Sequence, residues 1–205
     1  MHYAKTEAVA KALLQGKADP RIEDGAGCTP LHTVVDADVC NVLLRSKKGG
    51  GVADPGVNAV DKAGMSPLLS HVLHTNRSEV VQLLVEKASG LLNSDEQPIN
   101  VDLRAEDKFG RTALHHAASC NNYTAIQILL RSGQVDLNAV DRYGMTPLHI
   151  AASSDHIKTV SCLINQLADV TIRDACGRTA ADLAHAKGIK RLLVSSIQMQ
   201  RVRSQ

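Results

Sequence analysis

The sequence predicts an all-α protein built from stacked helix–turn–helix units, and two observations support this prediction. A short motif recurs along the 205-residue chain, as in "DRYGMTPLHIAA", which begins at Asp141. Each copy is followed by a segment with apolar residues at helical spacing, as in "HIKTVSCLI". Recurrence in register is typical of a structural unit, because a catalytic motif is expected only once in a chain.

The recurring motif predicts a turn that leads into a first helix. Asp-x-x-Gly favours a turn, since glycine adopts backbone conformations that other residues resist. Thr or Ser then follows as an expected N-cap, with Pro at the first helical position of three copies. The five glycines are separated by 37, 46, 34 and 33 residues; they are Gly27, Gly64, Gly110, Gly144 and Gly177.

Composition limits the classes of protein that the chain can represent. Hydrophobic residues make up 44% of the sequence but aromatic residues only 2%, so Leu, Val, Ile and Ala must fill the core. The formal net charge of +2 makes no case for nucleic-acid binding. Five cysteines without close spacing favour free thiols in a reducing compartment. We expect no membrane span, because no apolar run is long enough.

The pattern D-x-x-G-x-T-P-L-H-x-A-A, followed by a helix ending in Leu-Leu, resembles the ankyrin repeat. The resemblance implies a single α-solenoid domain over residues 1–205, with about five repeats and a partial N-terminal unit. The expected boundaries are 6–23 for the N-terminal capping repeat, 24–60 for repeat 1, 61–106 for repeat 2 with an insertion, 107–140 for repeat 3, 141–173 for repeat 4 and 174–205 for the C-terminal capping repeat with a basic tail. The insertion at 88–106 is equally compatible with a functional loop and with a disordered one.

Residues that could support chemistry are spread along the chain rather than gathered. His32, His115 and His149 occur once per repeat, and the family resemblance implies structural roles for them. A zinc site would need a closed ligand set, and the pair His71 and His74 supplies only half of one. We therefore expect no catalytic residue, no metal, no cofactor and no enzymatic activity.

The aromatic rings of Phe109 and Tyr143 are the sharpest binding candidates, because they fall at the tips of successive hairpins beside Arg142. Aromatic and arginine side chains are enriched at binding hot spots. The alternative is that one tip packs on the next. The family resemblance also implies that partners contact the hairpin tips and the first-helix side. The candidate contact residues are Lys62, Met65, Lys108, Phe109, Arg111, Arg142, Tyr143, Met145 and Arg178.

The expected function is a non-catalytic intracellular interaction module, acting as an adaptor, scaffold or targeting subunit in the cytoplasm or nucleus. Its partner would be a protein with an acidic and apolar patch, with no small-molecule substrate. One alternative is nucleic-acid or membrane-surface contact through the basic C-terminal segment, and a second is a metal-dependent or hydrolytic enzyme. "LRSGQVDLN" also resembles the ankyrin asparagine-hydroxylation pattern at Asn138, where a simple role in the turn is the competing explanation.

Overall fold

The structure is a computed structural model that describes residues 5–46, 56–89 and 99–203. It divides into two compact units, Met1–Lys108 (unit 1) and Phe109–Gln205 (unit 2). Every regular element among the described residues is helical, which confirms the predicted all-α class.

Unit 1 contains five α-helices and one 3₁₀ helix within its described residues. Their bounds are α1 Glu7–Gln15, α2 Pro30–Thr33, α3 Ala37–Leu44, α4 Pro67–Val72, η1 Thr75–Arg77 and α5 Ser78–Ser89. The first helices α2 and α4 pack on each other, and α3 packs against both α1 and α5. In α1, Ala10 is buried while Val9 and Leu13 are exposed.

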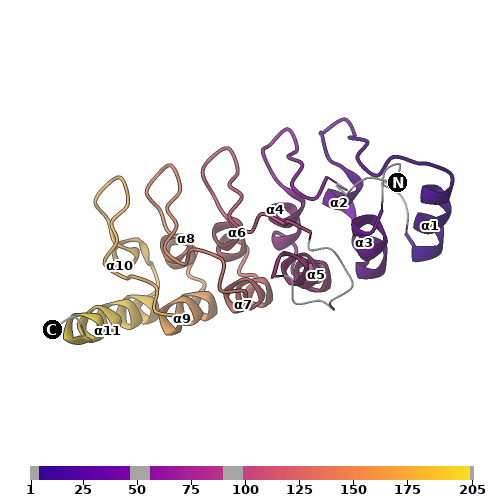
Figure 1. Ribbon diagram of the computed structural model, residues 1–205. Coiled ribbons are helices and arrows are strands. Elements are labelled where there is room, and N and C mark those ends of the chain that lie inside the picture. Colours follow the sequence, from indigo (N-terminus) through magenta and orange to yellow (C-terminus); the bar gives the residue numbers. More distant parts are fainter. Residues whose placement is uncertain (1–4, 47–55, 90–98, 204–205) are drawn as a thin grey trace. The chain divides into compact units, whose positions relative to one another are not determined.

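Unit 2 contains six α-helices within its described residues. Their bounds are α6 Ala113–Ser119, α7 Tyr123–Arg131, α8 Pro147–Ser153, α9 Ile157–Asn165, α10 Ala180–Leu183 and α11 Lys187–Arg203. First helices α6, α8 and α10 pack side by side, as do second helices α7, α9 and α11. Figure 1 shows the hairpin loops of this unit extending from the first-helix layer, away from the second helices.

Each first helix begins at the hydroxyl residue that the sequence predicts as its cap. Thr29, Ser66, Thr112, Thr146 and Thr179 all occupy the N-cap position with extended backbone. A capped start matters here, because helices of four to seven residues leave most of their backbone groups without an intrahelical partner.

The core of each unit is made of aliphatic side chains, as the composition requires. The largest fully buried ones are Leu31, Leu43, Leu44, Leu68, Leu69 and Leu84 in unit 1, and Leu114, Ile126, Leu129, Leu148, Leu163 and Ile189 in unit 2. Small residues let the first helices approach closely: Ala117 and Ala151 are fully buried in α6 and α8.

The last helix extends further than the sequence suggests. Helix α11 runs for 17 residues and takes in much of the segment that the sequence analysis describes as a basic tail. Gln200 supplies a reason, because its Nε2 donates to the carbonyl of Ala168 at 2.8 Å and its Oε1 accepts from the N–H of Val170 at 3.4 Å. The end of α11 is thereby tied to the loop that follows α9.

Candidate partner-binding surface

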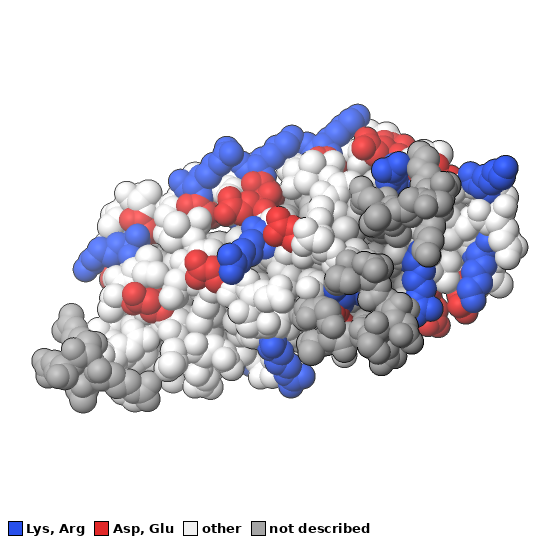
Figure 2. Space-filling view, viewed as in Figure 1, with Lys and Arg blue, Asp and Glu red and all other residues white. Residues whose placement is uncertain are grey.

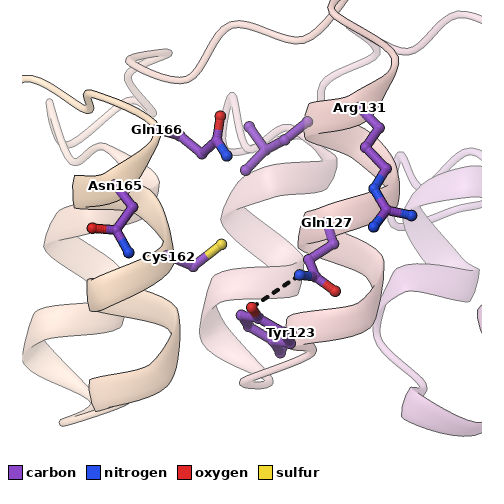
Figure 3. A pocket seen from close by; sticks show the side chains of 7 residues that line it. Tyr123, Gln127, Arg131, Cys162, Asn165 and Gln166 are labelled. Atoms are coloured by element: carbon purple, nitrogen blue, oxygen red, sulfur yellow. Dashed lines mark hydrogen bonds between the residues drawn. The ribbon is translucent and has the colours of Figure 1, made fainter.

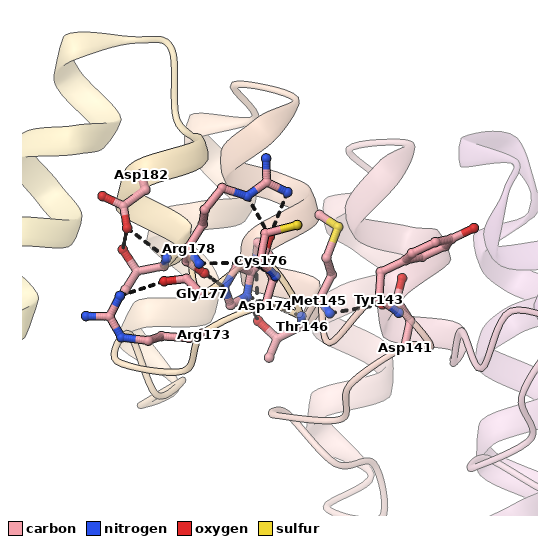
Figure 4. Close-up of polar contacts among 12 residues, drawn as sticks. Asp141, Tyr143, Met145, Thr146, Arg173, Asp174, Cys176, Gly177, Arg178 and Asp182 are labelled. Carbon is pink, nitrogen blue, oxygen red and sulfur yellow. Dashed lines mark hydrogen bonds and ion pairs between the residues drawn. The ribbon is translucent and has the colours of Figure 1, made fainter.

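The aspartate at the first position of the recurring motif shapes the hairpin tip. Asp141 Oδ1 accepts from the backbone N–H groups of Tyr143 and Met145, both at 2.9 Å. Asp174 Oδ1 accepts in the same way from Cys176 and Arg178, and Figure 4 shows both turns. The aspartate therefore fixes the backbone on which the variable tip residues stand.

Adjacent tips within unit 2 are joined by backbone hydrogen bonds. The N–H of Arg142 donates to the carbonyl of Phe109, and the N–H of Ala175 donates to that of Tyr143, both at 2.9 Å. Gly144 allows this approach with φ of +70°, since a Cβ there would lie 2.9 Å from the nitrogen of Ala175. The tips thus form a connected row whose side chains keep a fixed spacing.

The rings of Phe109 and Tyr143 remain exposed in this row, at 49% and 54% of their surface. The neighbouring tips donate backbone N–H groups to the carbonyls of these two residues but do not cover their rings. Arg142 belongs to the same tip as Tyr143, and its backbone N–H donates to the carbonyl of Phe109. Its side chain is exposed and pairs with no carboxylate among the described residues. Figure 4 shows the Tyr143 side chain directed away from the Asp174–Arg178 pair.

Two further arginines of the predicted set belong to ion pairs. Arg111 Nε lies 3.5 Å from Oδ2 of the buried Asp141, and its guanidinium lies 5.6 Å from the centroid of the Phe109 ring. Arg178 binds Asp174 Oδ2 through Nε at 2.9 Å and Nη2 at 2.7 Å. The Arg178 hydrogen bond holds the pKa of the Asp174 carboxyl below its ordinary value. Both arginines stabilise the tips through these ion pairs, and both keep part of their side-chain surface exposed.

The candidate residues of unit 1 differ from those of unit 2. Lys62 Nζ donates to the carbonyl of Gly25 at 2.8 Å, and Lys108 Nζ donates to the carbonyl of Lys62. Met65 departs from the expectation of an accessible contact, because its side chain is only 8% exposed. Its carbonyl accepts from His32 Nε2, so the residue serves the joint between repeats. In unit 2, Met145 is half-buried.

Figure 2 shows Lys and Arg side chains at the hairpin-loop edge of each unit, with Asp and Glu interspersed. In unit 2 the buried or paired carboxylates are Asp141 and Asp174, which leaves Arg142 as an uncompensated charge at the tips. The tip surface is defined as Phe109, Arg111, Arg142, Tyr143, Met145 and Arg178.

The histidines of the recurring motif are held in place by hydrogen bonds within their own repeat and to the next one. His115 Nδ1 accepts from the N–H of Thr112 at 3.1 Å, so its Nε2 carries the proton and donates to the carbonyl of Met145 at 2.9 Å. His149 makes the same pair of contacts with Thr146 and the carbonyl of Arg178. Burial lowers the pKa of both imidazoles, which favours their neutral form. Both ring nitrogens are occupied, so neither histidine is available for proton transfer.

Among the described residues, no group of three or more His, Cys, Asp and Glu side chains could hold a metal ion. His71 is buried, and its Nε2 donates to the carbonyl of Leu31 at 2.7 Å, while His74 is exposed. No helix in the described part of the chain has the length and apolar character needed to cross a membrane.

Asn138 takes part in the contact between two loops. Its Oδ1 accepts from the N–H of Asp169 at 2.9 Å, and its own N–H donates to Asp136 Oδ1 at 2.8 Å. This geometry gives Asn138 a structural role, and its hydroxylation stays a prediction.

Sequence reasoning assigned no function to the second helices α7 and α9. The structure places a groove between α7 and α9, lined in part by Tyr123, Arg131 and Gln166. The signal that could have pointed to it is the absence of Asp and Glu from the segments that form α7, α9 and α11.

Comparison with known proteins agrees with the repeat geometry. A family model described as "Ankyrin repeats (3 copies)" matches residues 91–174. The neurogenic locus notch homolog protein 1 of Mus musculus is 35% identical over 135 residues, which cover 64% of this chain and 4% of that protein. The neurogenic locus notch homolog protein 2 of Homo sapiens is 32% identical over 134 residues, covering 64% of this chain and 5% of that protein.

Among solved structures, the ankyrin repeat domain of Bcl-3, a member of the IkappaB protein family, matches with a TM-score of 0.75 and 26% identity. The match covers 94% of this chain and 77% of the Bcl-3 chain. Ankyrin repeats generally act as protein–protein interaction modules. The recurring capped turns, the paired helices and these similarities together show that the chain has the ankyrin-repeat fold, with residues 91–174 matching the family model itself.

Proposed function

We propose that this protein is a non-catalytic interaction module that binds a partner protein on its hairpin tips and first-helix side. It would act as an adaptor, scaffold or targeting subunit in the cytoplasm or nucleus. The observation that carries the proposal is the exposure of two aromatic rings, Phe109 and Tyr143, on adjacent tips that are hydrogen-bonded to each other.

Exposed rings on a fixed frame favour binding for an energetic reason. Burying an aromatic side chain removes a large apolar area from water, and rings are enriched at hot spots. The hydrogen bond between Arg142 N–H and the Phe109 carbonyl holds the two tips in register before a partner arrives. A surface that is already ordered loses less conformational entropy on binding.

The charge at the tips sets the chemistry of the partner. Arg142 is exposed and unpaired by any carboxylate of the described residues, and Arg111 and Arg178 keep part of their surface accessible. A carboxylate on the partner could form a charge-assisted hydrogen bond with Arg142. We therefore propose a partner whose contact patch combines acidic and apolar side chains.

The test is affinity capture from cell lysate with identification by mass spectrometry. The bait is the full chain, either wild type or the triple variant Phe109→Ala/Arg142→Ala/Tyr143→Ala. A matched control is Val9→Ala/Lys11→Ala/Leu13→Ala, which also removes two exposed apolar side chains and one cation, but from α1. Thermal unfolding followed by circular dichroism verifies that all three baits are folded.

We expect at least one protein to be captured by wild type and the control but lost with the tip variant. Its acidic and apolar patch should then protect the tips of unit 2 from hydrogen exchange. Equal capture by all three baits would sink the assignment of the tips. Capture dominated by nucleic acid or lipid would instead favour contact through the basic C-terminal segment.

A further inference from the structure

A groove lies on the second-helix side of unit 2, between α7 and α9, with a volume of about 290 Å³. Helix α7 lines it with Tyr123, Gln127 and Arg131, and α9 contributes Cys162 and Gln166. Figure 3 shows Cys162 and Gln166 extending from α9 toward α7. The groove lies on the helices that carry no hairpin, so it is separate from the tip surface.

The polar groups of the groove are largely unsatisfied. Gln127 Nε2 donates to the hydroxyl of Tyr123 at 2.9 Å, which leaves the Gln127 carbonyl without a described partner. The side-chain amides of Asn165 and Gln166 form no hydrogen bond among the described residues, and both residues are exposed. The groove thus offers donors and acceptors of the kind that pair with an extended peptide backbone.

Arg131 is the one charged residue that lines this groove, and no described carboxylate pairs with it. Cys162 adds no opposing charge, because burial raises the pKa of its thiol and keeps it neutral. A guanidinium presents five N–H donors in a fork that matches a carboxylate. The groove therefore lacks the anion that would complement it.

The positive character extends over all three second helices of unit 2. Helices α7, α9 and α11 contain no Asp or Glu. Their described basic side chains are exposed: Arg131, Lys158, Lys187, Lys190 and Arg191. The nearby carboxylate of Asp155 accepts from the N–H groups of His185 and Ala186, so it is already engaged. An excess of cations of this kind attracts anionic partners from a distance.

The corresponding groove of unit 1 shows that this charge is not a general result of the fold. A groove of about 320 Å³ between α3 and α5 is lined by Asp38, Glu79 and Glu86 and by no basic residue. The two grooves sit at the same place in their repeats and carry opposite charge. Each would reject a partner that suits the other.

We propose that the α7/α9 groove docks an acidic peptide segment of a partner protein. A carboxylate of the segment binds Arg131, its backbone hydrogen-bonds to the amides of Asn165 and Gln166, and an apolar side chain contacts the Tyr123 ring. The cations of α11 and Lys158 accelerate the encounter. This site is independent of the tip surface and could be occupied whether or not the tips bind a partner.

A peptide fits the groove better than the other anionic macromolecules. A membrane surface is contacted by apolar side chains that protrude, whereas this groove is recessed and lined with amides. Single-stranded nucleic acid is held by several stacking rings, and this groove has only Tyr123 among its described residues.

The test begins with a random peptide library displayed on phage. The bait is the full chain carrying Phe109→Ala/Arg142→Ala/Tyr143→Ala, so that peptides selected by the tip surface are removed. We expect the selected peptides to be enriched in Asp and Glu next to apolar residues. A fluorescein-labelled copy of the strongest peptide then serves as the probe for fluorescence anisotropy with the otherwise wild-type chain.

The decisive comparison uses two charge reversals of equal size in the same unit. Arg131→Glu should weaken binding of the probe by at least about ten-fold, the loss expected for one charge-assisted contact. Arg142→Glu should change it by no more than about two-fold, since it alters only the long-range field. Asn165→Ala/Gln166→Ala should weaken binding by an intermediate factor without changing net charge.

Several results would overturn the proposal. These are a selection with no acidic enrichment, an equal loss with both reversals, and displacement of the probe by oligouridylate or by phosphatidylserine vesicles in a manner that Arg131→Glu abolishes. Loss of lysate capture by the tip variant bears only on the proposed function, because the selection already uses a bait that lacks the tips.

Discussion

The joint between hairpin and first helix is built differently in α4 of unit 1 than in α6 and α8 of unit 2. In α6 and α8 of unit 2, His115 and His149 accept from the capping threonine and donate to a carbonyl of the following repeat. In α4 of unit 1, Leu69 stands at that position, and Ser66 caps the helix alone. His71 instead donates to the carbonyl of Leu31 in the preceding repeat, at 2.7 Å.

The difference teaches that a first helix can begin without a histidine at this position, because Ser66 caps α4 beside Leu69. His71 adds a second hydrogen bond between the two repeats that His32 already joins through the carbonyl of Met65. Each imidazole satisfies a buried carbonyl that would be costly to leave without a donor. His71 and His115 differ in the contact of their other ring nitrogen. His115 Nδ1 meets the neutral N–H of Thr112, whereas His71 Nδ1 lies 3.3 Å from the Arg77 guanidinium.

The largest expected effect comes from protonation of His71. Burial, with the nearby charge of Arg77 as a smaller cause, lowers the pKa of His71 to about 4 from the ordinary 6.5. Between these values the unfolded chain binds a proton that the folded chain excludes. The free energy of unfolding should therefore fall as the pH drops from 6.5 to 4, by on the order of 3 kcal/mol from His71.

Urea unfolding across this pH range measures that effect. His71→Gln should flatten the pH dependence of the free energy of unfolding. His74→Gln should remove a smaller part of it, because His74 is exposed although burial and Arg77 also lower its pKa. The lowered pKa values of His74, His115 and His149 act in the same direction and contribute to the slope that remains. An unchanged slope in His71→Gln would refute the role assigned to His71.

A smaller effect is expected when α6 of unit 2 is given the residue that stands at the same position in α4 of unit 1. His115→Leu places an aliphatic side chain where Leu69 stands in α4, and leaves the carbonyl of Met145 without its donor. We expect a loss of about 2 kcal/mol in the free energy of unfolding at neutral pH. His185→Leu, at an exposed position, is the matched control for loss of a histidine. If both variants unfold at the same urea concentration, the joint is not stabilised as described.

The smallest effect concerns the loops that connect successive repeats. Asn58 makes two contacts, accepting from the N–H of Asp102 at 2.9 Å and donating to the carbonyl of Asn100 at 2.6 Å. Asn138 makes one such contact, with Asp169. Asn58→Ala should cost about 1 kcal/mol and Asn138→Ala about half of that, because the groups are partly exposed.

Thermal unfolding compares the two asparagine variants with Asn165→Ala, which removes an exposed amide that has no described partner. A larger loss for Asn138→Ala than for Asn58→Ala would show that the number of contacts does not decide the strength of these loop connections.

The sequence by itself determined the class of fold and the place of each first helix. Asp-x-x-Gly, a hydroxyl N-cap and a following proline are local signals, because turns and helix starts are set by residues within a few positions of each other. The exposure of Phe109 and Tyr143 agrees with what their place in the turn suggested. Their role in binding stays a prediction.

Only the tertiary structure decided which side chains are satisfied by neighbours far along the chain. It buries Met65 beneath the joint, pairs Arg178 with Asp174 and leaves Arg131 without a carboxylate in the α7/α9 groove. It also turns His71 toward Leu31, 40 residues earlier. Repeat spacing alone cannot predict such contacts, because burial and pairing depend on what the packed helices bring together rather than on the local order of residues.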